Sequence, residues 1–385
     1  MLLTNNSTYP IGLDISDLSL KLVQLYKRRD KIKIQAISKL DLPKNIVVNG
    51  EIKNNAELIK SIKKIISSPL QGKVSSGEVV ACLPESKTFI KLIEVQKSPN
   101  KLTDIIGSEI EKHVPMSIDE IYYDWQVIED LSDKYLVLIG AAPKEIVNQY
   151  TQTLDRAGLS PVALEIEPMA IARCLLREEK FGSKPSGAGR NYGIIDIGAN
   201  HTCIIFYSGN TILFTVSMPI SGEAITSKIS QMLNLTKEQA EKAKIICGLD
   251  EHKADGVIKD ILADTLKALT EKIKESIAYY ENYFSQYGPL NQILFCGGGA
   301  NIPNLEKIIG EQLAIEVKLG SALVNLDESQ DKFNDIFTEK HTFNFMAAKI
   351  KSDVPEKEIT IKQNSTLTFS TAFGLALRGI FIDEL

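Results

Sequence analysis

The chain of 385 residues carries a net charge of −5 and has 24% charged and 44% hydrophobic residues. These values are typical of an ordinary globular protein, and without a concentrated basic block they argue against nucleic acid as a partner. The length is enough for two core-forming domains with a cleft between them. The 5 cysteines have neither zinc-ligand nor redox spacing, and the N-terminal residues do not resemble a signal peptide. We therefore expect a reducing, cytoplasmic environment.

A strand predicted for residues 9–15 carries Asp14 close to its end. The corner that follows contains Ser16, and alternating apolar residues predict two further strands, over residues 19–26 and 31–40. Lys21 stands on the first of these two strands. A short polar corner between strands is most often a plain surface turn, so this pattern needs support from elsewhere in the chain.

The same pattern returns in the middle of the chain. A predicted strand ends near Asp196, the corner contains Gly198 and Asn200, and Thr202 opens the next strand of a meander. A glycine without a Cβ allows an anion to approach the backbone N–H groups of such a corner. Because the pattern occurs twice, it favours a duplicated fold with one phosphate-binding corner in each half.

The segment between these two patterns is organised around an insertion. Residues 85–160 are predicted to form a compact α+β block within the first half. A strand then leads to Glu167, where Pro168 opens a helix. A carboxylate in a first helical turn has two interpretations, capping of the helix or a role in a site. Glycine, serine and proline mark residues 181–190 as a linker between the halves.

The second half adds helices after its meander. A helix predicted for residues 236–246 carries Glu241 and Lys244 on one face, a spacing more typical of a surface ion pair than of a ligand contact. A long amphipathic helix is predicted for residues 256–287.

A buried strand then leads into Gly297, Gly298 and Gly299. Consecutive glycines allow the backbone to approach a flat ligand such as a purine. Residues 321–365 are polar and irregular, and a helix of small residues over 371–377 closes the chain.

The order of these elements resembles that of the superfamily of actin, heat-shock chaperones and sugar kinases. Residues 14–21 and 196–202 resemble its two phosphate loops, residues 294–303 its adenosine loop, and residues 165–170 and 372–376 its two inter-domain connectors. The resemblance covers nearly the whole chain. It implies an α/β actin-like ATPase fold, with duplicated RNase H-like domains in two lobes around a nucleotide cleft. Ser16 departs from the pattern, because most of the superfamily has glycine there.

Within this superfamily the chain most resembles the PilM family of type IV pilus assembly. The discriminating segments are residues 18–25, the E-x-x-K-x-x-P helix end at 109–115, and the strand at 119–127. The resemblance implies four parts. These are a first domain of residues 9–84, 161–181 and 369–385, an inserted partner-binding subdomain of residues 85–160, a second domain of residues 191–225 and 290–368, and a helical adenosine-side subdomain of residues 226–289.

The resemblance also implies that the cleft binds ATP with magnesium. Asp14 and Asp196 would hold Mg²⁺ through water, and Glu167 would orient a hydrolytic water in a reaction that is slow at most. The other contacts would come from Ser16, Lys21, Gly198, Asn200 and Thr202 at the phosphates, Glu241 and Lys244 at the ribose and adenine, and Gly297, Gly298 and Gly299 under the base.

The implied role is that of a cytoplasmic adaptor at the inner membrane, in a pilus system or a related type II secretion or competence system. Its expected partner is the N-terminal cytoplasmic tail of a PilN-like inner-membrane protein. Pilus motor ATPases are further candidate partners, and self-association stays open. We expect no direct membrane insertion, because residues 378–385 are too short for the membrane helix that usually ends FtsA. The alternatives are a filament-forming, FtsA-like scaffold and a small-molecule kinase of the same fold.

Overall fold

The computed structural model describes residues 8–99, 101–177, 191–329, 333 and 365–381. The predicted linker at 181–190 and most of the irregular segment at 321–365 lie outside this part of the chain. Among the described residues, no helix is both long and apolar enough to cross a membrane.

The first half is built on a mixed sheet that begins with an antiparallel meander. Strand β1 pairs antiparallel with β2, which pairs antiparallel with β3, and on its other side β1 pairs parallel with β7, which pairs parallel with β11. The short β6 extends the edge beyond β3. The strands are β1 (Ile11–Ile15), β2 (Ser19–Arg28), β3 (Lys31–Asp41), β6 (Gln71–Gly72), β7 (Glu78–Leu83) and β11 (Ser160–Ile166).

The second half repeats this sheet. Its strand order is β14-β13-β12-β15-β16, with an antiparallel meander on one side of β12 and parallel strands on the other. Each strand therefore has a counterpart in the order β3-β2-β1-β7-β11 of the first half. The strands are β12 (Tyr192–Ile197), β13 (Thr202–Ser208), β14 (Thr211–Met218), β15 (Gln292–Cys296) and β16 (Val317–Leu319).

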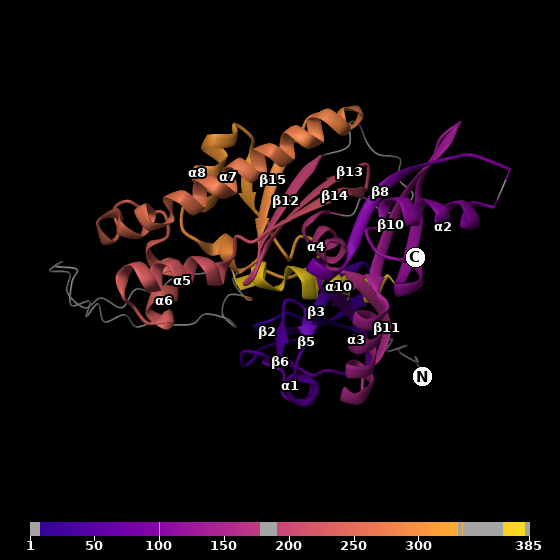
Figure 1. The fold of residues 1–385 in the computed structure, drawn as a ribbon. Helices are drawn as coiled ribbons and strands as arrows, with labels where there is room; N and C mark the ends of the chain where they lie inside the picture. Colours follow the sequence, from indigo (N-terminus) through magenta and orange to yellow (C-terminus); the bar gives the residue numbers. More distant parts are fainter. Residues whose placement is uncertain (1–7, 100, 178–190, 330–332, 334–364, 382–385) are drawn as a thin grey trace.

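Helices cover both sheets and also separate them (Figure 1). Apolar side chains of α1 and α3 pack with the first sheet, and those of α7 and α8 pack with the second. Helices α4 and α10 lie between the sheets and contact each other; α10 contacts β1, β2 and β7 of the first sheet, and α4 contacts strands of both halves. The bounds are α1 (Asn55–Ser67), α3 (Lys144–Ala157), α4 (Glu167–Leu175), α7 (Val257–Tyr283), α8 (Leu305–Leu313) and α10 (Ser370–Ile380).

Small residues allow α10 to pack this closely. A Cβ added to Gly12 on β1 would lie 2.4 Å from the carbonyl oxygen of Ala372, and one added to Gly374 would lie 1.8 Å from that of Ala170. A side chain at either position would push apart backbone segments that are in direct contact. The small residues of the closing helix are thus explained by packing.

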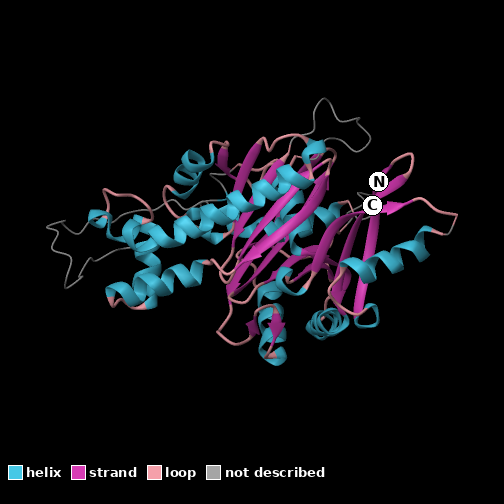
Figure 2. Ribbon diagram, turned by 45° about the horizontal axis from the view of Figure 1, so that its top comes forward, coloured by secondary structure: helices cyan, strands magenta, loops and turns pink. Residues whose placement is uncertain are grey.

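The inserted block contains a three-stranded sheet of order β8-β10-β9 (Figure 2). One set of its side chains packs with α2, and another joins the core of the second half, where β8 contacts β14. Helix α3 lies within residues 85–160, but its apolar side chains join the core of the first sheet with α1. The bounds are β8 (Phe89–Gln96), α2 (Leu102–His113), β9 (Ile121–Asp130) and β10 (Lys134–Pro143).

The remaining elements are short or lie at the edge of the second half. Helices α5 and α6 contact each other and α7, and Thr236 and Gln239 form a capping box at the start of α6. The bounds are β4 (Val47–Val48), β5 (Glu51–Ile52), α5 (Gly222–Leu233) and α6 (Lys237–Cys247), with 3-10 turns η1 (Glu85–Lys87), η2 (Ile118–Glu120), η3 (Ala254–Gly256), η4 (Ser285–Tyr287), η5 (Gly298–Asn301) and η6 (Ser365–Phe369).

Candidate functional site

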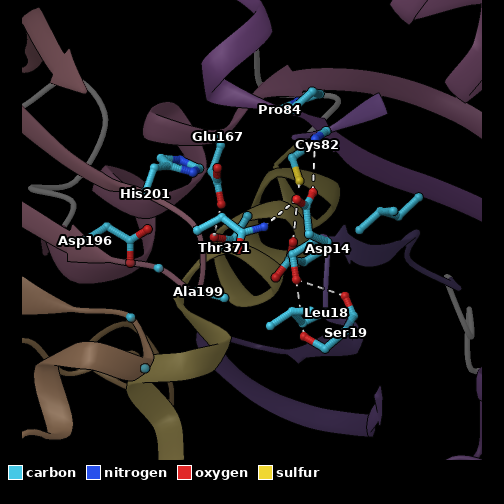
Figure 3. A pocket seen from close by; sticks show the side chains of 18 of the residues that line it. Asp14, Leu18, Ser19, Cys82, Pro84, Glu167, Asp196, Ala199, His201 and Thr371 are labelled. Atoms are coloured by element: carbon cyan, nitrogen blue, oxygen red, sulfur yellow. Dashed lines mark hydrogen bonds between the residues drawn. The ribbon is translucent and has the colours of Figure 1, made fainter. Parts of the chain in front are cut away.

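The two predicted corners face each other across one cavity of about 390 Å³. Figure 3 shows Asp14 and Asp196 on opposite sides of it, with Glu167 between them. A cavity between lobes, lined by a few convergent polar groups, is a typical small-molecule site. The predicted site residues that line it are Asp14, Ser16, Lys21, Glu167, Asp196, Gly198, Asn200, Gly297 and Gly298.

The first corner is electrostatically compensated. Asp14 on β1 lies opposite Lys21 on β2 in the antiparallel register, and Lys21 Nζ is 2.8 Å from Asp14 Oδ2. Burial opposes the charge of Lys21, but the carboxylate of Asp14 outweighs it and raises the pKa of Lys21. The Ser16 hydroxyl donates to the carbonyl oxygen of Ser19 at 3.0 Å, which holds the corner in shape.

The second corner is not compensated in this way. Asp196 at the end of β12 accepts a hydrogen bond from the thiol of Cys296 at 3.5 Å, and the basic side chain that lowers its pKa most is His201. Burial raises the pKa of Asp196, although His201 and the thiol act in the opposite direction. The backbone N–H groups of Gly222 and Glu223 at the start of α5 donate to the carbonyl oxygens of Gly198 and Ala199, each at 3.0 Å, and fix the corner.

Glu167 adds a third carboxylate. It occupies the first turn of α4 and its Oε1 accepts a hydrogen bond from Thr371 Oγ1 at 3.2 Å. Burial, followed by the charges of Asp14 and Asp196, raises the pKa of Glu167 well above its usual range. Four carboxyl groups, those of Asp14, Asp17, Glu167 and Asp196, therefore line a cavity in which Lys21 is already paired with Asp14. This excess of negative charge favours a cation.

The donor set fits a hydrated cation. Among the described residues, no three His, Cys, Asp or Glu side chains lie close enough together to ligate one ion directly. Magnesium retains several waters and is usually held by one or two carboxylates together with phosphate oxygens. The carboxylates on opposite walls suit that arrangement.

The three consecutive glycines of the turn after β15 differ in what surrounds them. A Cβ at Gly297, whose φ is +78°, would lie 2.4 Å from Asp196 Oδ1, so this glycine makes room for the carboxylate. A Cβ at Gly299 would lie 2.2 Å from Ile197 Cγ2, which is a core contact outside the cavity. Gly298 alone of the three faces open space, where the nearest atom to its Cβ would be 3.9 Å away.

Three other predicted residues also lie outside the cavity lining. Thr202 is fully buried, and its hydroxyl donates to the carbonyl oxygen of Ile220 at 2.6 Å. Lys244 is buried against α5, with its Nζ 2.7 Å from Glu241 Oε2 and 3.2 Å from the carbonyl oxygen of Gly222. In this structure Glu241 and Lys244 pair with each other, as the surface-pair interpretation predicts, although the lysine is buried.

The cavity also contains residues that the sequence did not single out. Asp17 contacts both halves, because it accepts hydrogen bonds from the backbone of Gly50 and from the side chain of Asn200. His201 lies 3.7 Å from Glu85, measured from Nε2 to Oε2. The sequence signal for Asp17 and His201 was their position just after a strand end. Their contacts depend on how the two lobes pack together, which the sequence does not show.

Solved structures define the class of fold. MreB5 of Spiroplasma citri bound to AMPPNP superposes with a TM-score of 0.53 at 12% identity, over 98% of both chains. The ethanolamine utilization protein EutJ from Carboxydothermus hydrogenoformans superposes with a TM-score of 0.52 at 15% identity, over 96% of this chain and 89% of that one. With the repeated sheets and the shared cavity, these likenesses define an actin-like ATPase fold.

The sequence narrows this class to one family. A sequence model described as type IV pilus assembly protein PilM matches residues 12–380, so the chain belongs to the PilM family. A chain of the PilM-PilN type IV pilus biogenesis complex superposes with a TM-score of 0.75 at 22% identity, over 97% of this chain and 98% of that one. The cell division protein FtsA of Streptococcus pneumoniae serotype 2 is 22% identical over 351 residues, which cover 80% of this chain and 74% of the relative.

Proposed function

We propose that the cavity binds ATP together with Mg²⁺. The observation that carries this proposal is the meeting of the two equivalent strand corners, from two repeated sheets, around one cavity that is lined by four carboxyl groups. The structure of MreB5 with AMPPNP supports it, because that protein has the same fold and is described with a bound nucleotide.

The residues at the cavity wall suit defined parts of this ligand. Asp14 and Asp196 would hold Mg²⁺ through water, and the backbone and side chains of Ser16, Gly198 and Asn200 would donate to phosphate oxygens. The bound ion would supply charge neutralisation for the phosphates and the carboxylates alike.

Hydrolysis by this cavity is expected to be slow. Glu167 is placed to orient a water molecule, but burial and the charges of Asp14 and Asp196 raise its pKa well above its usual range, which favours the protonated form of its carboxyl group. A protonated carboxyl group cannot accept a proton from water. We therefore propose nucleotide binding as a conformational signal, with turnover secondary.

The signal would serve an adaptor in type IV pilus assembly or a related type II secretion or competence system. We propose that the chain acts at the cytoplasmic face of the inner membrane and binds the N-terminal tail of a PilN-like protein. The family and the likeness to the PilM-PilN complex support this partner.

The inserted sheet offers a surface for an extended tail. Strand β9 is the last strand of the order β8-β10-β9, and within the described residues no strand pairs with its other edge. Tyr122 and Tyr123 on β9 are 48% and 42% exposed. An extended peptide can add to such an edge through backbone hydrogen bonds, with aromatic side chains beside it.

Calorimetry on the purified protein tests the proposal. We would titrate Mg-ATP with and without a synthetic peptide of the tail, and expect each ligand to change the affinity of the other by about 5- to 100-fold. The Tyr122→Ala/Tyr123→Ala double variant should lose the peptide, and Tyr283→Ala, at a tyrosine on α7 that is 66% exposed, is the control away from β9. Failure of a nucleotide-free sample to bind Mg-ATP would overturn the ATP site.

Sedimentation with nucleotide and lipid would instead support the FtsA-like scaffold, and phosphorylation of a small molecule would support the kinase.

A further inference from the structure

The carboxylate of Asp17 lies in the cavity wall, where backbone N–H groups of the protein donate hydrogen bonds to it. Its Oδ2 accepts a hydrogen bond from the backbone N–H of Asn49 at 2.6 Å, and its Oδ1 accepts one from the N–H of Gly50 at 2.9 Å. Asn49 and Gly50 form the turn between β4 and β5, with φ of +49° and +76°. Successive N–H groups that converge in this way form an anion-binding concavity.

A third donor comes from the other half of the molecule. Asn200, in the second corner, donates its Nδ2 hydrogen to Asp17 Oδ2. Asn200, Asn49 and Gly50 all line the cavity, so the donors that hold the carboxylate are the donors available to a phosphate group. Asp17 thereby joins the first corner, the β4–β5 turn and the second corner.

The basic side chains that line the cavity with Asp17 lie against other carboxylates. Lys21 pairs with Asp14, and Lys87 lies 2.5 Å from Glu51, measured from Nζ to Oε1. His201 faces Glu85. The negative charge of Asp17 is therefore held by hydrogen-bond donors and not by one of these ion pairs, and it stays available to repel a second anion.

We propose that Asp17 is an internal anion that competes with the nucleotide phosphates for Asn200 and the β4–β5 turn, and so sets a low affinity for nucleotide. This inference rests on the proposed ATP site. Binding of a phosphate group takes Asn200 away from Asp17 and breaks the bond between the lobes. The residue thus links nucleotide affinity to the contact between the two halves.

The test compares Mg-ATP and Mg-ADP affinities, by calorimetry, in the wild type and in Asp17→Asn. The amide keeps the shape and an oxygen acceptor but removes the charge, so we expect Mg-ATP to bind on the order of tenfold more tightly, with a smaller gain for the less charged Mg-ADP. Glu78→Gln removes one negative charge from an exposed residue at the start of β7 and should leave both affinities unchanged. An unchanged or weaker affinity of Asp17→Asn would overturn the inference.

A double-mutant cycle sharpens the competition. In the wild type, Asn200 has to leave Asp17 before it can donate to a phosphate group. Asn200→Ala removes both the phosphate donor and this cost, so the two effects on Mg-ATP affinity partly offset each other. In the Asp17→Asn background the offset is smaller, and Asn200→Ala should weaken Mg-ATP binding by a larger factor. Equal factors in the two backgrounds would show that Asp17 and Asn200 act independently, against the proposal.

A measurement without nucleotide separates this inference from the ATP site itself. Amide hydrogen exchange at Asn49 and Gly50 should be slow in the nucleotide-free wild type and faster in Asp17→Ala, because the carboxylate protects both N–H groups. If the exchange responds as expected and Mg-ATP binds the wild type but not more tightly to Asp17→Asn, the competition is wrong while the ATP site stands. If Mg-ATP binds neither protein, the ATP site and the inference fall together.

Discussion

Asp14 and Asp196 hold the same place in the two repeated sheets, yet their surroundings differ. Each lies near the end of the strand that starts a meander, beside a parallel strand, and each accepts a hydrogen bond from a buried thiol, Cys82 or Cys296. Asp14 also has the ammonium of Lys21 at 2.8 Å. Among the groups that shift the pKa of Asp196 most, the lysine is this same Lys21, which forms its ion pair with Asp14. The duplicated backbone therefore places two carboxylates symmetrically, while the side chains make their charges unequal.

Two glutamates at the end of β11 show the same contrast. Glu165 is buried between Arg173, at 2.6 and 2.7 Å, and Arg378, at 2.8 Å, whereas Glu167, two residues later, faces the cavity. Burial acts against the charge of both. The arginines outweigh it and lower the pKa of Glu165, and no such pair offsets it for Glu167, whose pKa is raised. Glu165, which holds helices together, is compensated, whereas Glu167, which faces the cavity, is not.

Glu165→Gln should have the largest effect on stability. Removal of the charge leaves two largely buried guanidinium groups without their partner, and we expect a loss of about 4 kcal/mol in the free energy of unfolding at pH 7. Because the pKa of Glu165 is lower in the folded state, its contribution is present above its usual value of 4.5 and is lost as the pH falls through the folded pKa. Urea unfolding from pH 7 downward should show the wild type and the variant converging below pH 4.5. Parallel curves would show that this network does not stabilise the connecting helices.

Asp14→Asn and Asp196→Asn separate the compensated corner from the uncompensated one. Asp14→Asn deprives the buried Lys21 of its counter-ion and should cost about 2 kcal/mol of stability, since the lysine keeps access to the cavity. Asp196→Asn removes a charge that burial disfavours and should change stability by less than about 0.5 kcal/mol. Both should lose Mg-ATP affinity in calorimetry. Equal stability losses would contradict the proposed difference between the corners.

The sequence predicted the corners well because a strand, a carboxylate and a small residue are local patterns. Asp14, Asp196 and Gly198 needed only their neighbours to be recognised, and repetition of the strand order supplied the rest. The role of Asp17 required the position of Asn200, 183 residues away, and no local pattern carries that information. The sequence also did not show which way the side chain of Lys244 on α6 points. In the structure it is buried and donates hydrogen bonds to Gly222 and Thr226 of α5.

Thr202→Val should have the smallest effect on Mg-ATP affinity, and it tests whether the second corner donates a hydroxyl to the phosphates. In the structure the hydroxyl donates to the Ile220 carbonyl, so its removal should cost about 1 kcal/mol of stability and change Mg-ATP affinity by less than about twofold. Ser16→Ala should instead weaken Mg-ATP binding about fivefold, because Ser16 lines the cavity and its hydroxyl can turn from the Ser19 carbonyl to a phosphate oxygen. Calorimetry on the two variants decides between a hydroxyl donor in one corner and a hydroxyl donor in both. An equal loss of affinity would mean that the Thr202 hydroxyl also leaves its carbonyl acceptor, Ile220, when nucleotide binds.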